Sequence, residues 1–291
     1  MSHQTFVPRI RIQNESIQGG RDYQEDFAKC VELPGGRIAI ILCDGHGGSA
    51  CSQYVLRSMI KELKQLKLDD WDIAPCIQRI SQRWNRKCLK VLGTKIWPQT
   101  EKERRYLFAQ APHRYFTEQW YSGTTLVVCL LDPVLRKGIM VNLGDSRGIW
   151  KDLDKTRSRL RSTRDHVPYA DDLGPLGGEI ITEVNDVPRI NGDLAVGRAI
   201  GDNTAELLGT VKDKPTIKEI TWGKGHRFRV VVASDGVWDV VSNSHAIRAT
   251  SAADLIDVAV KRNSTDNITA VHLEIDYVNR DYVLFSSESC S

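Results

Sequence analysis

Four aspartates stand at the ends of apolar runs that have the character of buried strands. Asp44 follows the run Ile38 to Leu42, Asp145 follows MVNLG, Asp235 follows VVVAS, and Asp266 directly precedes NITAVHLEI. Each one alone is typical of a turn, because Asp bonds its own backbone and an adjacent Gly accepts a positive φ. Antiparallel packing can bring such strand ends to one edge, so together the four predict a cluster of carboxylates.

A carboxylate cluster has a chemical consequence. Like charges held together raise one another's proton affinity and cost stability unless a cation neutralises them. Ligand sets made only of oxygen suit hard cations such as Mg²⁺ or Mn²⁺, which bind few carboxylates and keep several waters. The spacing therefore predicts a water-rich site for two metal ions.

Two further segments add groups that suit phosphate chemistry. GGRDYQEDF places the adjacent acids Glu25 and Asp26 after Arg21, whose planar fork matches phosphate oxygens. CDGHGG places His46 two residues after Asp44. By themselves QED is typical of a surface loop and a His beside Gly is usually a loop residue. Next to two metals, these groups would form a site for hydrolysis of a phosphate ester.

The elements that must position these residues are predicted from periodicity. Five runs rich in β-branched residues and bounded by turn residues predict strands, namely Arg37 to Leu42, Leu126 to Leu131, Gly138 to Leu143, Arg229 to Ala233 and Ile268 to Ile275. A sixth run, Arg147 to Trp150, follows the third after only GDS, which predicts an antiparallel hairpin between them. Helical spacing predicts helices over Ser49 to Leu66, Pro75 to Leu92 and Ala246 to Val260.

Composition limits the other classes of function. The 291 residues carry 40 Lys and Arg against 37 Asp and Glu, and a net charge of +3 predicts no nucleic-acid partner. Basic residues outnumber acids between Arg79 and Arg114, which we interpret as a solvated helical face rather than a docking site. No apolar run approaches the roughly 18 residues that span a bilayer, so no membrane association is expected.

The N-terminus and the cysteines bear on the compartment. MSHQTFVPRI has neither a secretion signal nor Gly after Met, so no leader and no myristoylation are expected. The seven cysteines are odd in number and scattered through apolar segments, which predicts reduced thiols rather than disulfides or a zinc site. We expect a cytoplasmic or nuclear protein.

In their order along the chain, the motifs resemble those of the metal-dependent Ser/Thr protein phosphatases of type 2C, the PPM family. The motifs are RDYQED, CDGHGG, SGTT, GDSR, DHVP, NGDLAVGRAIGD, ASDGVWDVVSN and STDNIT. Each one alone is a weak signal, but eight in the family's order are highly specific. The resemblance implies an α+β fold with four layers, a sandwich of two antiparallel β-sheets flanked by helices. We expect one catalytic domain over residues 1–291, with a disordered tail from about residue 280.

The resemblance also implies a set of metal ligands. Asp44 would bridge two Mg²⁺ or Mn²⁺ ions, Asp235 and Asp266 would complete one site, and Glu25 with the Gly45 carbonyl would serve the other. A separate group has supporting or optional roles. Asp26 would orient this network, and Asp145 and Asp239 would hold a third, weaker metal or serve as turn and helix-capping acids.

Catalytic roles follow from the same resemblance. His46 would protonate the departing seryl or threonyl oxygen, and Arg21 would hold the phosphate. Attack by a metal-activated water would be direct and in line, without a phosphoenzyme. Phosphorylated proteins would be the substrates of a monomeric enzyme. In NGDLAVGRAIGD, Arg198 and Asp202 are expected to brace a flap rather than to touch substrate.

Three alternatives remain beside this interpretation. CSQYVLR, Cys51 to Arg57, has the Cys-x5-Arg spacing of thiol phosphatases but lies in a helical pattern, so Cys51 is expected in the core. DLDKT, Asp152 to Thr156, fits the aspartyl-phosphate pattern but follows a hairpin arm and is expected to be an exposed loop. A pseudophosphatase that serves as a binding module would be expected to lack a ligand, and all the proposed ligands are present.

Overall fold

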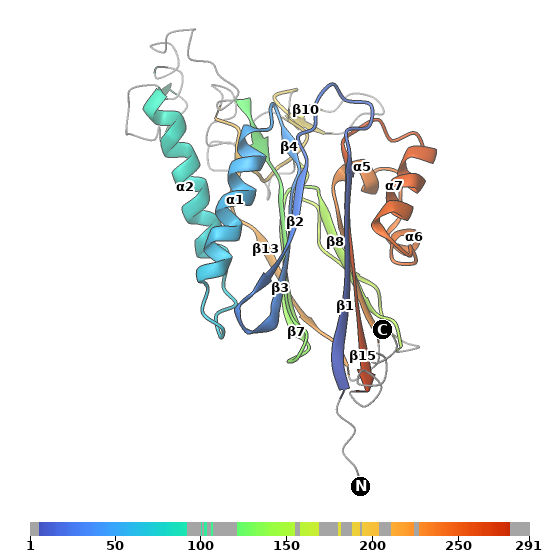
Figure 1. The fold of residues 1–291 in the computed structure, drawn as a ribbon. Coiled ribbons are helices and arrows are strands. Elements are labelled where there is room, and N and C mark those ends of the chain that lie inside the picture. Colours follow the sequence, from blue (N-terminus) through green and yellow to red (C-terminus); the bar gives the residue numbers. More distant parts are fainter. Residues whose placement is uncertain are drawn as a thin grey trace, which may run out of the picture.

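Four layers make up the fold. The computed structural model describes residues 6–91, 100, 102–103, 106, 121–154, 158–168, 180–181, 188–192, 194–203, 211–223 and 227–279. Two antiparallel sheets stand face to face, and helices cover both outer faces (Figure 1). This arrangement confirms the predicted α+β sandwich, whereas the predicted disordered tail lies outside the described residues.

Each of the two sheets has five strands, all paired antiparallel. The first sheet has the order β13 (Thr216–Thr221), β7 (Lys137–Leu143), β6 (Leu126–Asp132), β3 (Arg37–Cys43) and β2 (Phe27–Leu33). The second has the order β1 (Phe6–Ile17), β15 (Ile268–Asn279), β14 (Arg227–Ala233), β8 (Arg147–Asp152) and β9 (Arg161–Ser162). All six predicted strands are present. The sequence did not predict β1, β2, β9 and β13, because these edge strands mix exposed polar residues with partly buried ones.

The predicted hairpin between β7 and β8 is wrong. β7 pairs with β6 and β13 in one sheet, and β8 pairs with β14 and β9 in the other. The short connection crosses the sandwich instead of reversing within a sheet, and Gly144 makes the turn at φ 109°, where a side chain would be strained. The crossing leaves Asp145 between the ends of the two sheets.

Hydrophobic packing joins the layers through three main clusters of buried side chains. Strand β3 shows the principle, because successive side chains of a strand point to opposite faces. Ala39 and Ile41 face the helices of the first sheet, while Ile38 and Ile40 face the second sheet. A strand buried on both faces has an unbroken apolar sequence, which is why its ends could be located so clearly.

Helices α1 (Ala50–Gln65) and α2 (Ala74–Val91) cover the first sheet, and α5 (Asp235–Trp238), α6 (Asn243–Ala246) and α7 (Ala252–Lys261) cover the second (Figure 1). The first two helices confirm the predicted ones within the described residues. None of the described helices combines the length and apolarity that crossing a membrane requires.

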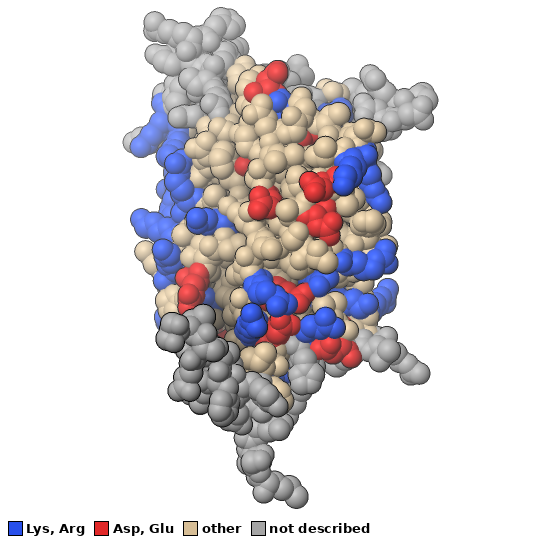
Figure 2. Space-filling model, turned by 45° about the vertical axis from the view of Figure 1, so that its right-hand side comes forward, with Lys and Arg blue, Asp and Glu red and all other residues tan. Residues whose placement is uncertain are grey.

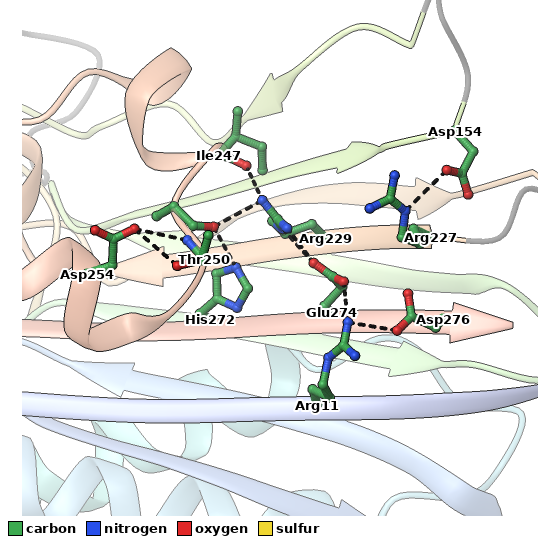
Figure 3. Close-up of polar contacts among 11 residues, drawn as sticks. Arg11, Asp154, Arg227, Arg229, Ile247, Thr250, Asp254, His272, Glu274 and Asp276 are labelled. Carbon is green, nitrogen blue, oxygen red and sulfur yellow. Dashed lines mark hydrogen bonds and ion pairs between the residues drawn. The ribbon is translucent and has the colours of Figure 1, made fainter.

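The third predicted helix is wrong in its first part, because the chain leaves helical geometry between α6 and α7. Arg229 of β14 donates hydrogen bonds to the carbonyls of Ile247 at 2.8 Å and Ala249 at 3.0 Å, as Figure 3 shows for this region. The hydroxyl of Ser251 then caps α7 by accepting a hydrogen bond from the Asp254 amide at 3.0 Å. A residue from a distant strand thus interrupts a helix that local spacing favours.

Short strands complete the described elements. β4 (Gly45–His46), β5 (Gly123–Thr124) and β12 (Ile200–Gly201) form a small sheet in the order β12-β5-β4. β10 (Ile180–Ile181) pairs with β11 (Arg189–Ile190), and a 3-10 turn, η1, covers Pro34–Gly36. The small three-stranded sheet matters most, because it carries His46.

Candidate active site

Asp44 is held firmly where β3 ends. Its carbonyl accepts hydrogen bonds from the Thr125 amide at 2.9 Å and the Thr124 hydroxyl at 3.1 Å. Its carboxylate oxygen Oδ2 accepts from the Ser146 hydroxyl at 3.0 Å and from the Asp235 amide at 3.4 Å. The SGTT and GDSR motifs therefore fix both the backbone and the side chain of Asp44.

Three carboxylates meet at this end of the sandwich. One oxygen from each of Asp44, Asp145 and Asp235 lies within 4.8 Å of the other two. Burial, followed by the charge of Asp26 and of Asp145, raises the pKa of Asp44 well above its usual range. Burial also raises the pKa of Asp145 to about 7. Carboxylates packed in this way are unfavourable as anions unless positive charge is added.

The carboxylate group fits divalent cations. Its donors are all oxygen, which is the ligand type of Mg²⁺ and Mn²⁺. Oδ2 of the neighbouring Asp26 is buried and accepts no hydrogen bond within the described residues, and burial raises the pKa of Asp26 to about 7. A buried carboxylate oxygen with no donor is an acceptor left for a water or a cation.

The acids predicted as ligands divide into two sets. Asp145, for which a turn role was equally open, lies directly in the carboxylate group with Asp44 and Asp235. Among the described residues, neither Asp266 nor Glu25 contributes an oxygen to this group of three.

The other acids lie beside the group of three and have partners of their own. Oδ2 of Asp266 pairs with Nη2 of Arg21 at 2.6 Å, and the carboxylate of Glu25 accepts a hydrogen bond from the Gly48 amide. The Glu25 amide in turn donates to Oδ1 of Asn267 at 2.8 Å. Asn267 thus links the RDYQED segment to the STDNIT segment from the other end of the chain.

Asp239 and Arg21 stand at the rim. Asp239 is exposed at the residue after α5 and lies outside the group of three carboxylates. The side chain of Arg21 is 57% exposed and bound to Asp266, so its guanidinium is accessible at the rim of the carboxylate cluster. A cationic fork at this place could bind a phosphate group.

His46 faces Asp202. Nε2 of His46 donates to Oδ1 of Asp202 at 2.6 Å, across 156 residues of sequence. Burial alone would lower the pKa of His46, but the carboxylate of Asp202, with help from Asp44 and Asp145, raises it to about 9. The contact with Asp202 therefore favours the charged form of the imidazole.

The sequence interpretation did not predict the contact between Asp202 and His46. With Arg198, Asp202 was expected to brace the flap that precedes the motif, much of which lies outside the described residues. Nη1 of Arg198 donates to the Lys214 carbonyl at 3.0 Å, which lies after the motif. The dipeptide Gly201-Asp202 repeats the dipeptide Gly144-Asp145. This repeated GD pattern is the feature of the sequence that could have marked Asp202 as a residue of the site. Pairing of β12 with β5 brings Asp202 to His46.

Gly123 of the SGTT motif permits this pairing. A Cβ atom added at Gly123 would collide with Nε2 of His46 and with both carboxylate oxygens of Asp202. Gly123 pairs with His46 on one side and with Gly201 on the other. Because Gly123 has no side chain, the side chains of His46 and Asp202 can meet beside it.

The two alternative phosphatase motifs have structural roles. Cys51 is fully buried in α1, and its thiol donates to the Ile200 carbonyl at 3.2 Å. Asp152 ends β8 and is buried rather than exposed as expected, and it accepts a hydrogen bond from the Gly223 amide at 3.1 Å. Thr156, the last residue of that motif, lies outside the described residues.

Comparisons with known sequences show the family of this chain. A sequence profile of the family described as Protein phosphatase 2C matches residues 15–268. Probable protein phosphatase 2C 27 of Oryza sativa subsp. japonica is 27% identical, over 92% of this chain and 76% of its own length. Protein phosphatase 1L of Bos taurus is 28% identical, over 88% of this chain and 70% of its own length.

Solved structures share the fold. A C. elegans sex determining protein superposes with a TM-score of 0.67 at 19% identity, covering 95% of this chain and 67% of that one. The catalytic domain of the serine threonine protein phosphatase PstP, in complex with two manganese ions, superposes with a TM-score of 0.59 at 20% identity, covering 94% of this chain and all of that one. At these identities the likeness shows the fold, and the profile match over most of the sequence shows the family. This chain belongs to the protein phosphatase 2C family and is a protein serine/threonine phosphatase.

Proposed function

We propose that this chain hydrolyses phosphoserine and phosphothreonine esters of proteins as a single, monomeric catalytic domain with two Mg²⁺ or Mn²⁺ ions. The observation that carries the proposal is the meeting of three carboxylates at one end of the sandwich, together with a nearby imidazole that pairs with the buried carboxylate of Asp202. The proposal includes no binding of nucleic acid or membranes. A cytoplasmic or nuclear location stays a prediction.

Metal ligation would use the acids at the strand ends. Asp44 would bridge the two ions, with Asp235 and Asp266 on one of them and with Glu25 and the Gly45 carbonyl on the other. Asp26 would orient the bound waters, and Asp145 with Asp239 would hold a third, weaker ion. When bound, such ions lower the pKa of a water and stabilise the charge that develops on the phosphate. The close approach of Asp145 to Asp44 supports its place in this set.

Proton supply to the leaving group would come from His46. The seryl or threonyl oxygen leaves as a poor alkoxide unless it is protonated, so an acid near the phosphate is needed. The carboxylate of Asp202 keeps the imidazolium charged and fixes the direction of the ring. His46 follows Asp44 by two residues, which supports a position beside the proposed metals.

Phosphate binding would use Arg21. Its exposed guanidinium pairs with Asp266 in this structure. A cation on Asp266 would weaken that pair and leave the planar fork free for two phosphate oxygens. Arg21 thus would bind substrate only when the site is loaded.

Hydrolysis of p-nitrophenyl phosphate and of a phosphoserine peptide tests the proposal. We expect turnover with Mn²⁺, none after chelation, and recovery on adding Mn²⁺ back. Asp235→Asn should remove turnover while the unfolding temperature with chelator does not fall. Activity that persists in chelator would refute the metal mechanism, and a folded protein inactive with every cation would favour the pseudophosphatase alternative.

A further inference from the structure

The helical layer over the first sheet is strongly basic. The two helices carry eight Lys and Arg side chains and one acid, Glu62. The basic residues, all exposed, are Arg57, Lys61 and Lys64 on α1 and Arg79, Arg83, Arg86, Lys87 and Lys90 on α2, and together they are termed the basic face. Since the whole chain has a net charge of only +3, the rest of it is net acidic. The positive charge is therefore concentrated on one side.

Helical spacing places these charges on one surface. On α1 they recur at i, i+4 and i+7, opposite Val55, Met59 and Leu63, which are fully buried. Four of the five on α2 recur at i, i+4, i+7 and i+11. Blue side chains accordingly line the left edge of Figure 2, the side on which Figure 1 shows α1 and α2.

Contacts between the helices join the two stripes. Glu62 of α1 binds Arg79 of α2 at 2.6 Å and Arg83 at 2.8 Å. Nζ of Lys87 lies 4.2 Å from the centre of the Tyr54 ring on α1. The basic face is thus one continuous surface across both helices.

Most of this charge has no acidic partner within the described part of the chain. Glu62 satisfies two arginines, while Lys61, Lys64 and Lys90 make no ion pair there. Like charges one turn apart on a helix destabilise it. A bound anion would reduce this repulsion between like charges, so the surface is suited to binding an anion.

The basic face extends to the catalytic end of the molecule. Nδ2 of Asn203 donates to Oδ1 of Asn85 on α2 at 3.3 Å, and Asn203 follows Asp202, the partner of His46. Arg86 and Lys87 directly follow Asn85. The other helix, α1, begins at Ala50, four residues after His46.

The sequence alone favoured a solvated helical face for the α2 part of this surface, but the contacts and charges described above favour a docking site. We propose that the basic face docks an acidic segment of the phosphoprotein substrate, so that the enzyme prefers phosphoserine and phosphothreonine sites flanked by Asp and Glu. This inference rests on the proposed phosphatase function. With 16 residues, α1 is about 24 Å long, which about seven residues of extended peptide would span. Neither helix exposes a large apolar side chain in its described part. An extended acidic polypeptide therefore fits this surface better than a membrane, which apolar side chains help to bind.

The test compares two phosphoserine peptides that differ only in a flank of about seven residues, acidic in one and made of the matching amides in the other. The variant Lys61→Glu/Arg86→Glu/Lys90→Glu reverses three charges of the basic face. If each of the three exposed ion pairs with the peptide changes KM by about a factor of two, the KM of this variant for the acidic peptide should rise about eightfold. Its KM for the amide peptide and its kcat on p-nitrophenyl phosphate should stay unchanged.

A matched control reverses three exposed charges outside α1 and α2, Arg9→Glu/Arg248→Glu/Lys261→Glu. This control should keep the preference for the acidic peptide. Equal KM values for both peptides with the wild-type protein, or equal losses in the two triple variants, would overturn the docking proposal. If the basic-face variant loses only its binding to phosphatidylserine vesicles, the surface binds membranes and the proposal is wrong.

Direct binding separates this inference from the proposed function. Fluorescence anisotropy of a labelled, unphosphorylated acidic peptide needs no turnover, and we expect it to bind the wild type and the control but not the basic-face variant. Absence of any hydrolysis with Mn²⁺ would refute the phosphatase proposal alone. Normal hydrolysis without binding of the acidic peptide would refute the docking proposal alone.

Discussion

The Nε2 atom of His46 lies 2.6 Å from Oδ1 of Asp202, although 156 residues separate the two in the sequence. The side chain of His46 is 27% exposed and that of Asp202 is 1% exposed. A buried carboxylate thus holds an accessible imidazole in place and keeps it charged. This pair connects the CDGHGG motif to the NGDLAVGRAIGD motif.

Asp202→Asn should lower the upper pH limit of activity. The pKa of His46 is raised to about 9, so its acid form is present below that pH and is lost above it. Removing the carboxylate should bring this limit down toward the usual histidine value of about 6.5. The measurement is the pH profile of kcat on a phosphoserine peptide, and an unchanged limit would contradict the assignment.

His46→Gln should impair substrates with poor leaving groups more than activated ones. A seryl oxygen needs a proton as it leaves, whereas p-nitrophenolate does not. We expect a loss of about 10²–10⁴-fold on the phosphopeptide and a much smaller loss on p-nitrophenyl phosphate. Equal losses on both substrates would show that His46 is no general acid.

Gly123→Ala should damage activity more than its effect on stability suggests. The new methyl group would collide with both His46 and Asp202 and push the pair apart. Overpacking of this kind costs about 1–3 kcal/mol. A suitable control is Gly36→Ala, where a Cβ would meet nothing within 4 Å although φ is 74°. The control should lose stability from backbone strain but keep kcat, and a variant at Gly123 with normal kcat would argue against the paired geometry.

Chelated protein should lose stability as the pH rises from about 4 to about 7. Folding raises the pKa of Asp145 and of Asp26 to about 7, so the folded state binds protons more tightly than the unfolded state, whose aspartates titrate near 3.9. The stabilisation that comes from this tighter proton binding is present at low pH and is lost as the pH rises. Thermal unfolding with chelator should show it, Mn²⁺ should remove it, and Asp145→Asn should reduce it. Stability that instead rises through this window would contradict the raised values.

Arg229→Ala should be strongly destabilising. Nε of Arg229 lies 3.0 Å from Oε2 of Glu274, and the same guanidinium binds the carbonyls between α6 and α7 (Figure 3). The side chains of Arg229 and Glu274 are only 13% and 7% exposed. Glu274 keeps Arg11 as a partner at 2.6 Å in the variant, so the loss comes from the hydrogen bonds of the Arg229 guanidinium, and hydrogen bonds to charged groups contribute about 1.5–3 kcal/mol each. Denaturant unfolding measures this loss.

Arg227→Ala is the control for that experiment. Its Nε lies 3.3 Å from Oδ1 of Asp154 in a pair whose arginine is 52% exposed (Figure 3), and exposed pairs contribute about 0–1 kcal/mol. Similar losses of unfolding free energy in the two variants would mean that the contacts of Arg229 with Glu274 and with the α6–α7 segment stabilise the fold no more than an exposed ion pair does.

The sequence by itself determined the family, the layers and most of the acids of the site. Buried strands such as β3 have unbroken apolar sequences, so the acids that follow them are recognisable as strand ends. Local spacing also determined α1 and α2, because an amphipathic stripe can be recognised from residues that are close together in the sequence.

Only the tertiary structure decided which strand ends meet. β7 and β8 are joined by three residues yet lie in different sheets, and this crossing puts Asp145 beside Asp44. Pairing of β12 with β5 brings Asp202 to His46, and Arg229 breaks the helix that local spacing favoured. Each of these contacts joins residues that are far apart in sequence or depends on the choice of sheet. Hydrophobic periodicity specifies which residues of a strand are buried but not which strand it pairs with.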